Sequence, residues 1–90
     1  MRLDKWLWFA RFFKTRSLAQ AAIEAGTVRL NGRPVDKTAR GVAIDDEMIF
    51  PTGRKWRRVR VLALGERRGP APEARALYVE LDPPPVPDGG

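Results

Sequence analysis

The stretch "WLWFARFFKTRS", residues 6–17, places a dense group of aromatic side chains directly beside a basic segment. It holds five of the eight aromatic residues of the chain, namely Trp6, Trp8, Phe9, Phe12 and Phe13. Basic and hydroxyl side chains are interleaved with them or follow at once, namely Arg11, Lys14, Thr15, Arg16 and Ser17. A membrane-active helix, a helix of a protein core and the start of a nucleic-acid-binding surface all have such a composition.

Residues 2–13 have the spacing of an amphipathic helix. One apolar stripe is formed by Leu3, Trp6, Leu7, Ala10 and Phe13. Trp8 and Phe12 are four residues apart and lie on the other side, near Asp4, Lys5 and Arg11. Either a second layer of protein or a bound partner must therefore cover Trp8 and Phe12. We favour cover by the C-terminal strands, because large exposed aromatic side chains are uncommon on monomers.

The segment after this helix contains the signals of a second helix and a hairpin. Lys14-Thr15-Arg16 separates the two helices, and Ser17 with Gln20 has the form of a capping box. Gly26 supplies a left-handed C-cap. Asn31-Gly32, between alternating residues, predicts a type I′ hairpin over 27–35. Pro34 makes the returning strand a short one or an edge of the sheet.

The rest of the chain reads as strands and a tail. Short strands are expected at 48–50, 56–64 and 76–81, with a turn at 51–55 and a loop at 65–73. Residues 82–90, "DPPPVPDGG", cannot contribute to a core and are expected to form an extended, mobile tail. We therefore predict one α+β domain over 1–81 followed by the tail at 82–90.

Composition favours a polyanion as the partner. The chain has 90 residues and a formal net charge of +6, with a balance of +8 over residues 1–60 and of −2 over 61–90. Thirteen of the 17 basic residues are Arg, which binds phosphate through two hydrogen bonds and stacks on bases. A merely solvated basic surface is the alternative. Blocks of positive charge more often indicate RNA or DNA.

Several classes of protein are disfavoured. The chain has no Cys and no His, so disulfides, thiolate metal sites and most nucleophile–base pairs are excluded. Ser17 is the only serine, and no imidazole can activate it. No apolar segment reaches the roughly 20 residues that span a membrane, and the first residues do not form a clear signal peptide. We expect a cytoplasmic monomer that is not an enzyme and has no cofactor, metal or small-molecule substrate.

The start of the second helix is suited to binding a phosphate group. Free backbone N–H groups and the helix dipole favour an anion there, and Lys14-Thr15-Arg16-Ser17 adds cations and hydroxyl donors. Arg11 precedes this corner, while Arg29, Lys37 and Arg40 follow on the hairpin and its loop. We expect one basic face that combines the helix corner with the hairpin.

These residues resemble a known family. The sequences at 2–8, 10–12, 14–16, 18–19, 26 and 28–32 resemble the RNA-binding domain named after small-subunit ribosomal protein four, also called the alpha-L motif. More narrowly, "RLDKWLWFARFFKTRSLA" at 2–19 and the segment from Arg67 to Tyr78 are similar to the bacterial heat shock protein 15 family. The match extends over most of residues 2–80.

The resemblance implies two helices packed on a small, mostly antiparallel sheet. It implies binding of structured ribosomal RNA, and for the narrower family binding of the free large ribosomal subunit with a nascent chain on tRNA after heat stress. The RNA-binding residues that we predict are Arg2, Lys5, Arg11, Lys14, Thr15, Arg16, Ser17, Gln20, Arg29, Asn31, Lys37 and Arg40. Family members usually continue into a basic helical extension, so its contacts are not expected from the acidic, proline-rich residues 82–90.

Three weaker signals remain. Lys55, Trp56, Arg57 and Arg58 form a secondary RNA site or, equally, a core-anchoring tryptophan with solvated cations. The acidic run at 45–47 is expected to be a polar turn, since a magnesium site needs oxygens that converge from distant segments. A DNA-binding helix-turn-helix is the alternative function, but only Gln20 and Glu24 of the second helix could contact base edges.

Overall fold

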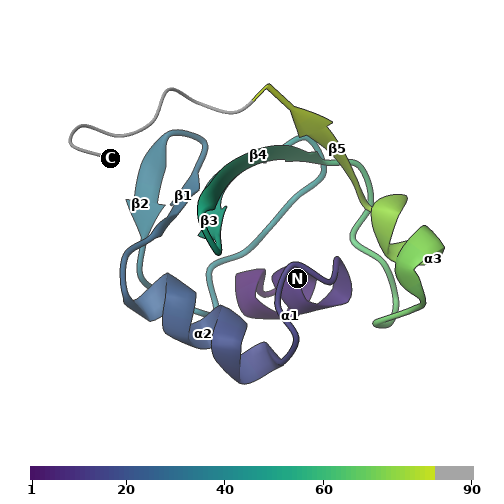
Figure 1. The fold of residues 1–90 in the computed structure, drawn as a ribbon, viewed down its shortest axis with the longest axis horizontal. Coiled ribbons are helices and arrows are strands. Elements are labelled where there is room, and N and C mark those ends of the chain that lie inside the picture. The colour runs from purple at the N-terminus through teal and green to yellow at the C-terminus, as the bar shows by residue number, and fades with distance from the viewer. Residues whose placement is uncertain (83–90) are drawn as a thin grey trace.

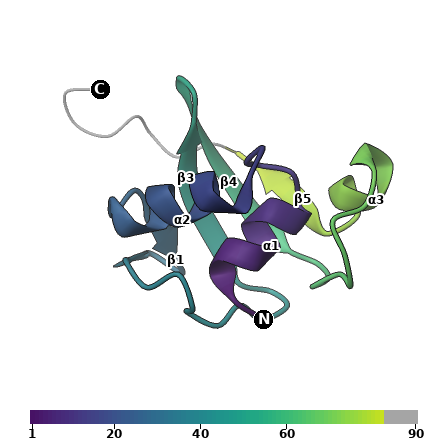
Figure 2. The ribbon, with the colours of Figure 1, turned by 90° about the horizontal axis from the view of Figure 1, so that it is seen from below.

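The computed structural model describes residues 1–82, which form three helices and a five-stranded antiparallel sheet. The strand order is β2-β1-β3-β4-β5, and helices α1 and α2 lie against one face of the sheet (Figure 1). Figure 2, seen from the helix side, shows both helices crossing the strands. The elements are α1 (Leu3–Phe9), α2 (Arg16–Glu24), β1 (Val28–Leu30), β2 (Arg33–Val35), β3 (Glu47–Thr52), β4 (Lys55–Val61), α3 (Ala71–Arg75) and β5 (Tyr78–Leu81). The α+β prediction is confirmed.

The core lies between the sheet and the first two helices. Alternate residues of β1, β3 and β4 point toward the helices, because successive side chains of a strand face opposite sides. Trp6 is fully buried, and its indole Nε1 donates to the carbonyl of Ala63 at 2.9 Å. The largest buried apolar side chains are Trp6, Phe50, Leu3, Leu7, Ile23, Met48, Val28, Val59 and Val61.

Helix α1 ends at Phe9, not at residue 13 as the apolar spacing predicts. Arg11 has a positive φ of 65°, its N–H donates to the Trp8 carbonyl, and the N–H of Phe12 donates to the carbonyl of Leu7 at 3.2 Å. This is the Schellman ending of a helix, formed here without glycine. The chain therefore turns, and Phe12 leaves the helix to pack against the sheet.

Trp8 and Phe12 are both covered by protein, in different ways. The Phe12 ring lies 4.8 Å from the ring of Phe50 and 4.6 Å from that of Tyr78, so β3 and β5 cover it as expected. Trp8 is covered instead by the loop after β4. The guanidinium of Arg68 lies 5.4 Å from its ring, and the Arg68 Nε donates to the Trp8 carbonyl.

The N-cap of helix α2 lies two residues before the predicted cap, Ser17. Thr15 is the N-cap residue, and its Oγ1 accepts a hydrogen bond from the N–H of Leu18 at 3.1 Å. The predicted capping box of Ser17 and Gln20 is therefore wrong, since Ser17 lies inside the first turn. Gly26 has a φ of +77° and closes the helix as predicted. The amide of Gln20 is consequently free to bind elsewhere.

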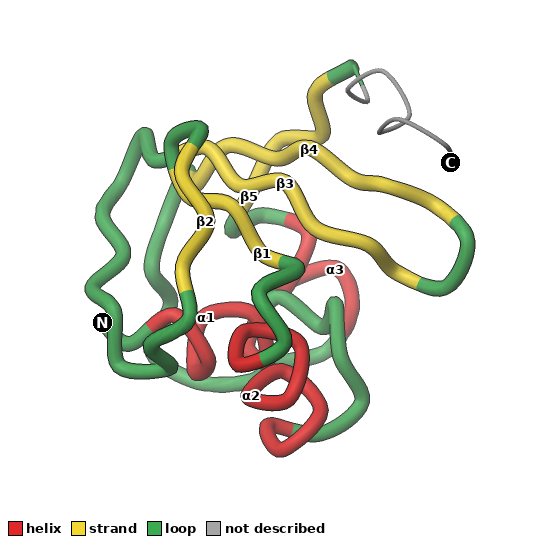
Figure 3. The backbone as a smooth tube through the Cα atoms, turned by 90° about the vertical axis from the view of Figure 1, so that its left-hand side faces the viewer, coloured by secondary structure: helices red, strands yellow, loops and turns green. Residues whose placement is uncertain are grey.

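The hairpin and its edge strand agree with the prediction. Asn31 and Gly32 both have positive φ, as a type I′ turn requires, and β2 with Pro34 lies at the edge of the sheet. The later strands differ in their ends. The β3–β4 hairpin extends past the helices in Figure 3, and its turn is centred on Gly53. In the predicted loop, α3 begins after its N-cap Pro70 and contains Pro72 in its first turn, where proline is tolerated.

The predicted tail and the expected absence of a membrane-spanning segment are considered for the described residues only. Apart from Asp82, the predicted tail at 82–90 lies outside them. Within residues 1–82, no helix has both the length and the apolar character needed to cross a membrane.

Candidate nucleic-acid interface

A buried carboxylate organises the predicted RNA-binding surface. Asp4 on α1 is 0% exposed. Its oxygens accept hydrogen bonds from Arg2 Nε at 3.1 Å, Arg16 Nε at 3.2 Å and Gln20 Nε2 at 2.9 Å. The N–H of Lys5 donates to the same carboxylate at 2.9 Å. One acidic side chain therefore joins the start of α1 to the first turns of α2.

The charge of Asp4 is stabilised by these donors. Burial raises the pKa of Asp4, but the hydrogen bonds from Gln20, Arg2 and Arg16 outweigh it and lower the pKa from 3.8 to about 2. The carboxylate is thus ionised at neutral pH, and it accepts from Nε of Arg16 and from both Nε and Nη2 of Arg2. Arg2 and Arg16 keep 47% and 36% of their side chains exposed, so both side chains remain partly accessible to a ligand.

The loop before Gly41 is hydrogen-bonded to the residues beside Asp4. Arg2 Nη2 donates to Thr38 Oγ1 at 3.3 Å, and the N–H of Leu3 donates to the Arg40 carbonyl at 2.9 Å. Lys37 and Arg40 are exposed on this loop. We call the set of Arg2, Lys14, Arg16, Ser17, Lys37 and Arg40 the basic corner.

Lys14 and Ser17 complete the basic corner at the start of α2. Both are exposed, whereas the hydroxyl of Thr15 is engaged as the N-cap. The backbone N–H groups of the first turn lack helical partners and favour an anion, as does the positive end of the helix dipole. The corner thus combines cations, a hydroxyl and free backbone donors.

The structure does not bring four predicted residues into this corner. Arg29 lies between the buried Val28 and Leu30, so its side chain is on the face of the sheet opposite the helices. The amide of Asn31 is engaged by Asp46 and by the N–H of Glu47. The Nζ of Lys5 lies over the Phe9 ring, 5.5 Å from its centre. The Nε of Arg11 donates to the Gly69 carbonyl at 2.6 Å.

The predicted secondary set is divided between the two faces of the sheet. Arg57 points toward the helices, lies 4.9 Å from the Phe12 ring and is paired with Glu80, which raises its pKa. Arg58 points to the opposite face and donates to Glu47. Lys55 is exposed at the tip, and Trp56 is partly buried, opposite Pro51. The set does not form a single stacking platform.

The acidic run at 45–47 is used within the protein. Asp46 accepts from the N–H of Ala43 and from Asn31, while Glu47 accepts from Arg58 and Arg60, whose hydrogen bonds lower its pKa. Over residues 1–82, no group of three acidic, His or Cys side chains has an arrangement that could hold a metal ion.

Sequence reasoning missed Asp4 as a site residue. The helical spacing assigns Asp4 to the polar side, and its partners Arg16 and Gln20 lie 12 and 16 residues away. The only local signal is its position between Arg2 and an apolar stripe. A carboxylate is almost never fully buried without partners, so this burial marks Asp4 as a positioning residue.

Comparison with known proteins gives three related results. The S4 domain family matches residues 1–48. A heat shock protein 15 homolog of Haemophilus influenzae is 42% identical over 82 residues, covering 91% of this chain and 62% of the relative. An RQC P-site tRNA stabilizing factor of Halalkalibacterium halodurans is 40% identical over 55 residues, covering 61% of each protein.

A solved structure has the same fold. The heat shock protein 15 of Vibrio cholerae, described as trimeric, superposes with a TM-score of 0.87 at 40% identity, covering 91% of this chain and 82% of that one. The chain spans about 60% of the length of the curated heat shock protein 15 relatives that it matches, with 62% and 59% for two of them. The chain belongs to the heat shock protein 15 family and carries its S4 RNA-binding domain at the N-terminus.

Proposed function

We propose that this protein binds structured ribosomal RNA through the basic corner, without catalysis, and that its target is the free large ribosomal subunit carrying peptidyl-tRNA after heat stress. The Asp4 cluster carries this proposal, because it fixes Arg2 and Arg16 beside the free N–H groups of α2. The S4 domain supports RNA as the ligand. The relatives, a heat shock protein and a P-site tRNA stabilizing factor, support heat stress as the setting and the ribosome as the target.

Binding would depend mainly on phosphate contacts. Each exposed guanidinium or ammonium group that neutralises a phosphate releases counterions, so affinity falls as salt rises. Arg16 is held through Nε alone, which leaves its terminal nitrogens to donate to phosphate oxygens. Arg2 uses both Nε and Nη2 within the protein, so Nη1 is its donor for a phosphate. Side chains contact the grooves of duplex RNA poorly, so the shape of the backbone would decide recognition. Six other residues remain predicted RNA contacts although they lie outside the basic corner as defined here: Lys5, Arg11, Thr15, Gln20, Arg29 and Asn31.

The alternative, a DNA-binding helix-turn-helix, is less well supported by the geometry. A recognition helix must present polar side chains to base edges. Gln20 of α2 uses its amide nitrogen to bind Asp4, and Glu24 is the other candidate. The charged groups of the basic corner suit phosphates rather than bases.

We propose a cytoplasmic monomer as the functional form, although the Vibrio cholerae relative is described as trimeric. Sedimentation at the concentration used for binding tests this point. A trimer of about three times the 10.2 kDa mass would contradict the monomer.

The decisive experiment compares purified large ribosomal subunits, empty and carrying peptidyl-tRNA, with duplex DNA and an unrelated structured RNA, all at physiological salt. We expect the loaded subunit to bind tightest. The double variant Lys14→Ala, Arg16→Ala should lose this binding, whereas Arg54→Ala, Arg67→Ala, with the same change in charge away from the corner, should retain it. Equal, weak binding to every polyanion would overturn the proposal.

A further inference from the structure

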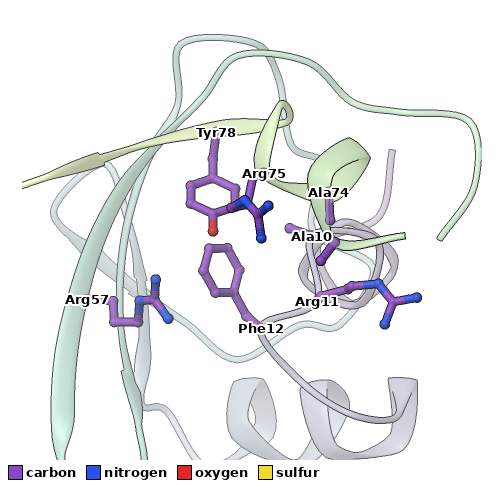
Figure 4. Close-up of a pocket in the computed structure, with 8 residues that line it drawn as sticks. Ala10, Arg11, Phe12, Arg57, Ala74, Arg75 and Tyr78 are labelled. Carbon is purple, nitrogen blue, oxygen red and sulfur yellow. The ribbon is translucent and has the colours of Figure 1, made fainter. Parts of the chain in front are cut away.

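We propose that the cavity between the end of α1, strands β4 and β5 and helix α3 holds one unpaired nucleotide of the bound RNA. The inference rests on the proposed function, and it assigns to the cavity a ligand of defined chemistry: an aromatic base joined to a phosphate. Figure 4 shows the cavity and the side chains that line it.

The cavity is built around two aromatic rings. Phe12 and Tyr78 are in contact, with their ring centres 4.6 Å apart and their planes tilted by 49°, and both are only partly buried (Figure 4). The volume of the cavity is about 210 Å³. Sites for complete small molecules have volumes of roughly 300–1,000 Å³. A space of this size fits one unit of a polymer that is anchored elsewhere.

The charge around the cavity is positive. Arg11, Arg57 and Arg75 line it, and none of its lining residues is acidic. The charge of Arg57 is compensated by Glu80. Arg75 has no ion pair with any residue in the range 1–82, and in Figure 4 its guanidinium lies beside the two rings. An anionic group is therefore favoured next to Arg75, at the edge of the aromatic pair.

Aromatic rings with arginine are the groups that proteins use to bind unpaired bases. Bases of RNA that are not stacked in a helix pack against aromatic side chains or guanidinium planes, largely without regard to sequence. An acidic peptide would use the arginines but would gain little from the rings. The combination therefore favours a nucleotide over a carboxylate side chain.

The cavity is joined directly to the basic corner. Phe12 lines the cavity and Thr15 caps α2, so only Phe13 and Lys14 separate the two places, and the three steps along the chain span at most about 11 Å. The positive φ of Arg11 directs Phe12 out of the helix and into the cavity wall. An RNA backbone that lies on the start of α2 can thus place an adjacent unpaired nucleotide in the cavity.

The test uses two RNA stems of equal sequence, one blunt and one with a three-nucleotide overhang that contains 4-thiouridine. We expect the protein to bind the overhang RNA about fivefold to tenfold more tightly, a typical gain from one stacked base. Irradiation should crosslink the thiouridine to Tyr78 or Phe12. Arg75→Gln should abolish the preference and keep the affinity for the blunt stem, and Arg67→Gln, the matched control, should keep both.

The outcomes separate the two proposals. Equal affinity for both stems, or a preference that Arg75→Gln leaves intact, would overturn the cavity assignment while the proposed function stands. If the unaltered protein bound neither RNA stem, the proposed function would be overturned, and the cavity assignment with it. Thermal unfolding of Arg75→Gln checks its fold, and this exposed side chain without an ion pair in the described structure should be dispensable for stability.

Discussion

Replacing Asp4 by asparagine should destabilise the protein and weaken RNA binding together. A pKa lowered from 3.8 to about 2 means that folding favours the ionised carboxyl by about 2.5 kcal/mol at neutral pH. Asparagine keeps the shape but presents an NH2 group to a cluster made of donors. We therefore expect a loss of about 2–3 kcal/mol, which for a domain of this size lowers the Tm by about 10–20 °C.

The pH dependence of this loss follows from the sign of the shift. The folded pKa of Asp4 lies below its unfolded value, so the stabilisation is fully present above about pH 5 and disappears as the pH falls toward 2. Denaturant unfolding of the protein and of Asp4→Asn at several pH values measures it. The difference in unfolding free energy should be largest at pH 7 and should shrink steadily in acid.

Asp36→Asn is the matched control, because Asp36 is exposed and its substitution changes the charge equally. Its effect should stay within about 0.5 kcal/mol. RNA affinity of Asp4→Asn should fall even though the net charge becomes more positive, because Arg2 and Arg16 lose the group that positions them. Unchanged stability at pH 7, or a difference that does not shrink in acid, would refute the reasoning.

Three further results are expected. Thr15→Ala should cost about 1 kcal/mol in denaturant unfolding, whereas Ser17→Ala should cost almost nothing, because Thr15 caps α2; the reverse order would restore the capping box. Phe12→Ala should cost about 2–3 kcal/mol in the same assay through lost ring contacts with β3 and β5; a cost below about 0.5 kcal/mol would show that these contacts are not stabilising. Lys14→Ala with Arg16→Ala should lower the slope of log affinity against log salt by about 1.5; an unchanged slope would place the phosphate elsewhere.

Signals that act over a few residues were sufficient for the second helix and the hairpin. Gly26 ends α2, and Asn31-Gly32 forms the turn, because each of these residues tolerates a positive φ. The early end of α1 could not be predicted in this way. Arg11 adopts the left-handed conformation without the usual sequence signal, since the contacts of Phe12 with the sheet favour it.

The parts of the site that escaped prediction are those that depend on distant contacts. The burial of Asp4 requires Arg16 and Gln20 from another helix, and the cover of Trp8 requires Arg68, 60 residues away. Neither contact has a periodic signal. The division of Arg57 and Arg58 between two faces was implicit in the alternation of a strand, but only the register of β4 shows which face is covered.

Residues 6–17 thus contribute to both the fold and the proposed interface, through different side chains. Trp6 and Phe9 are buried in the core, Phe12 crosses to the sheet after the left-handed Arg11, and Arg16 returns to α1 through Asp4. The same carboxylate that closes the contact between the helices holds two cations of the basic corner, Arg2 and Arg16. Under the proposed function, stability and RNA affinity should therefore be coupled through Asp4, and a bound phosphate, by favouring the ordered arginines, should stabilise the folded state in turn.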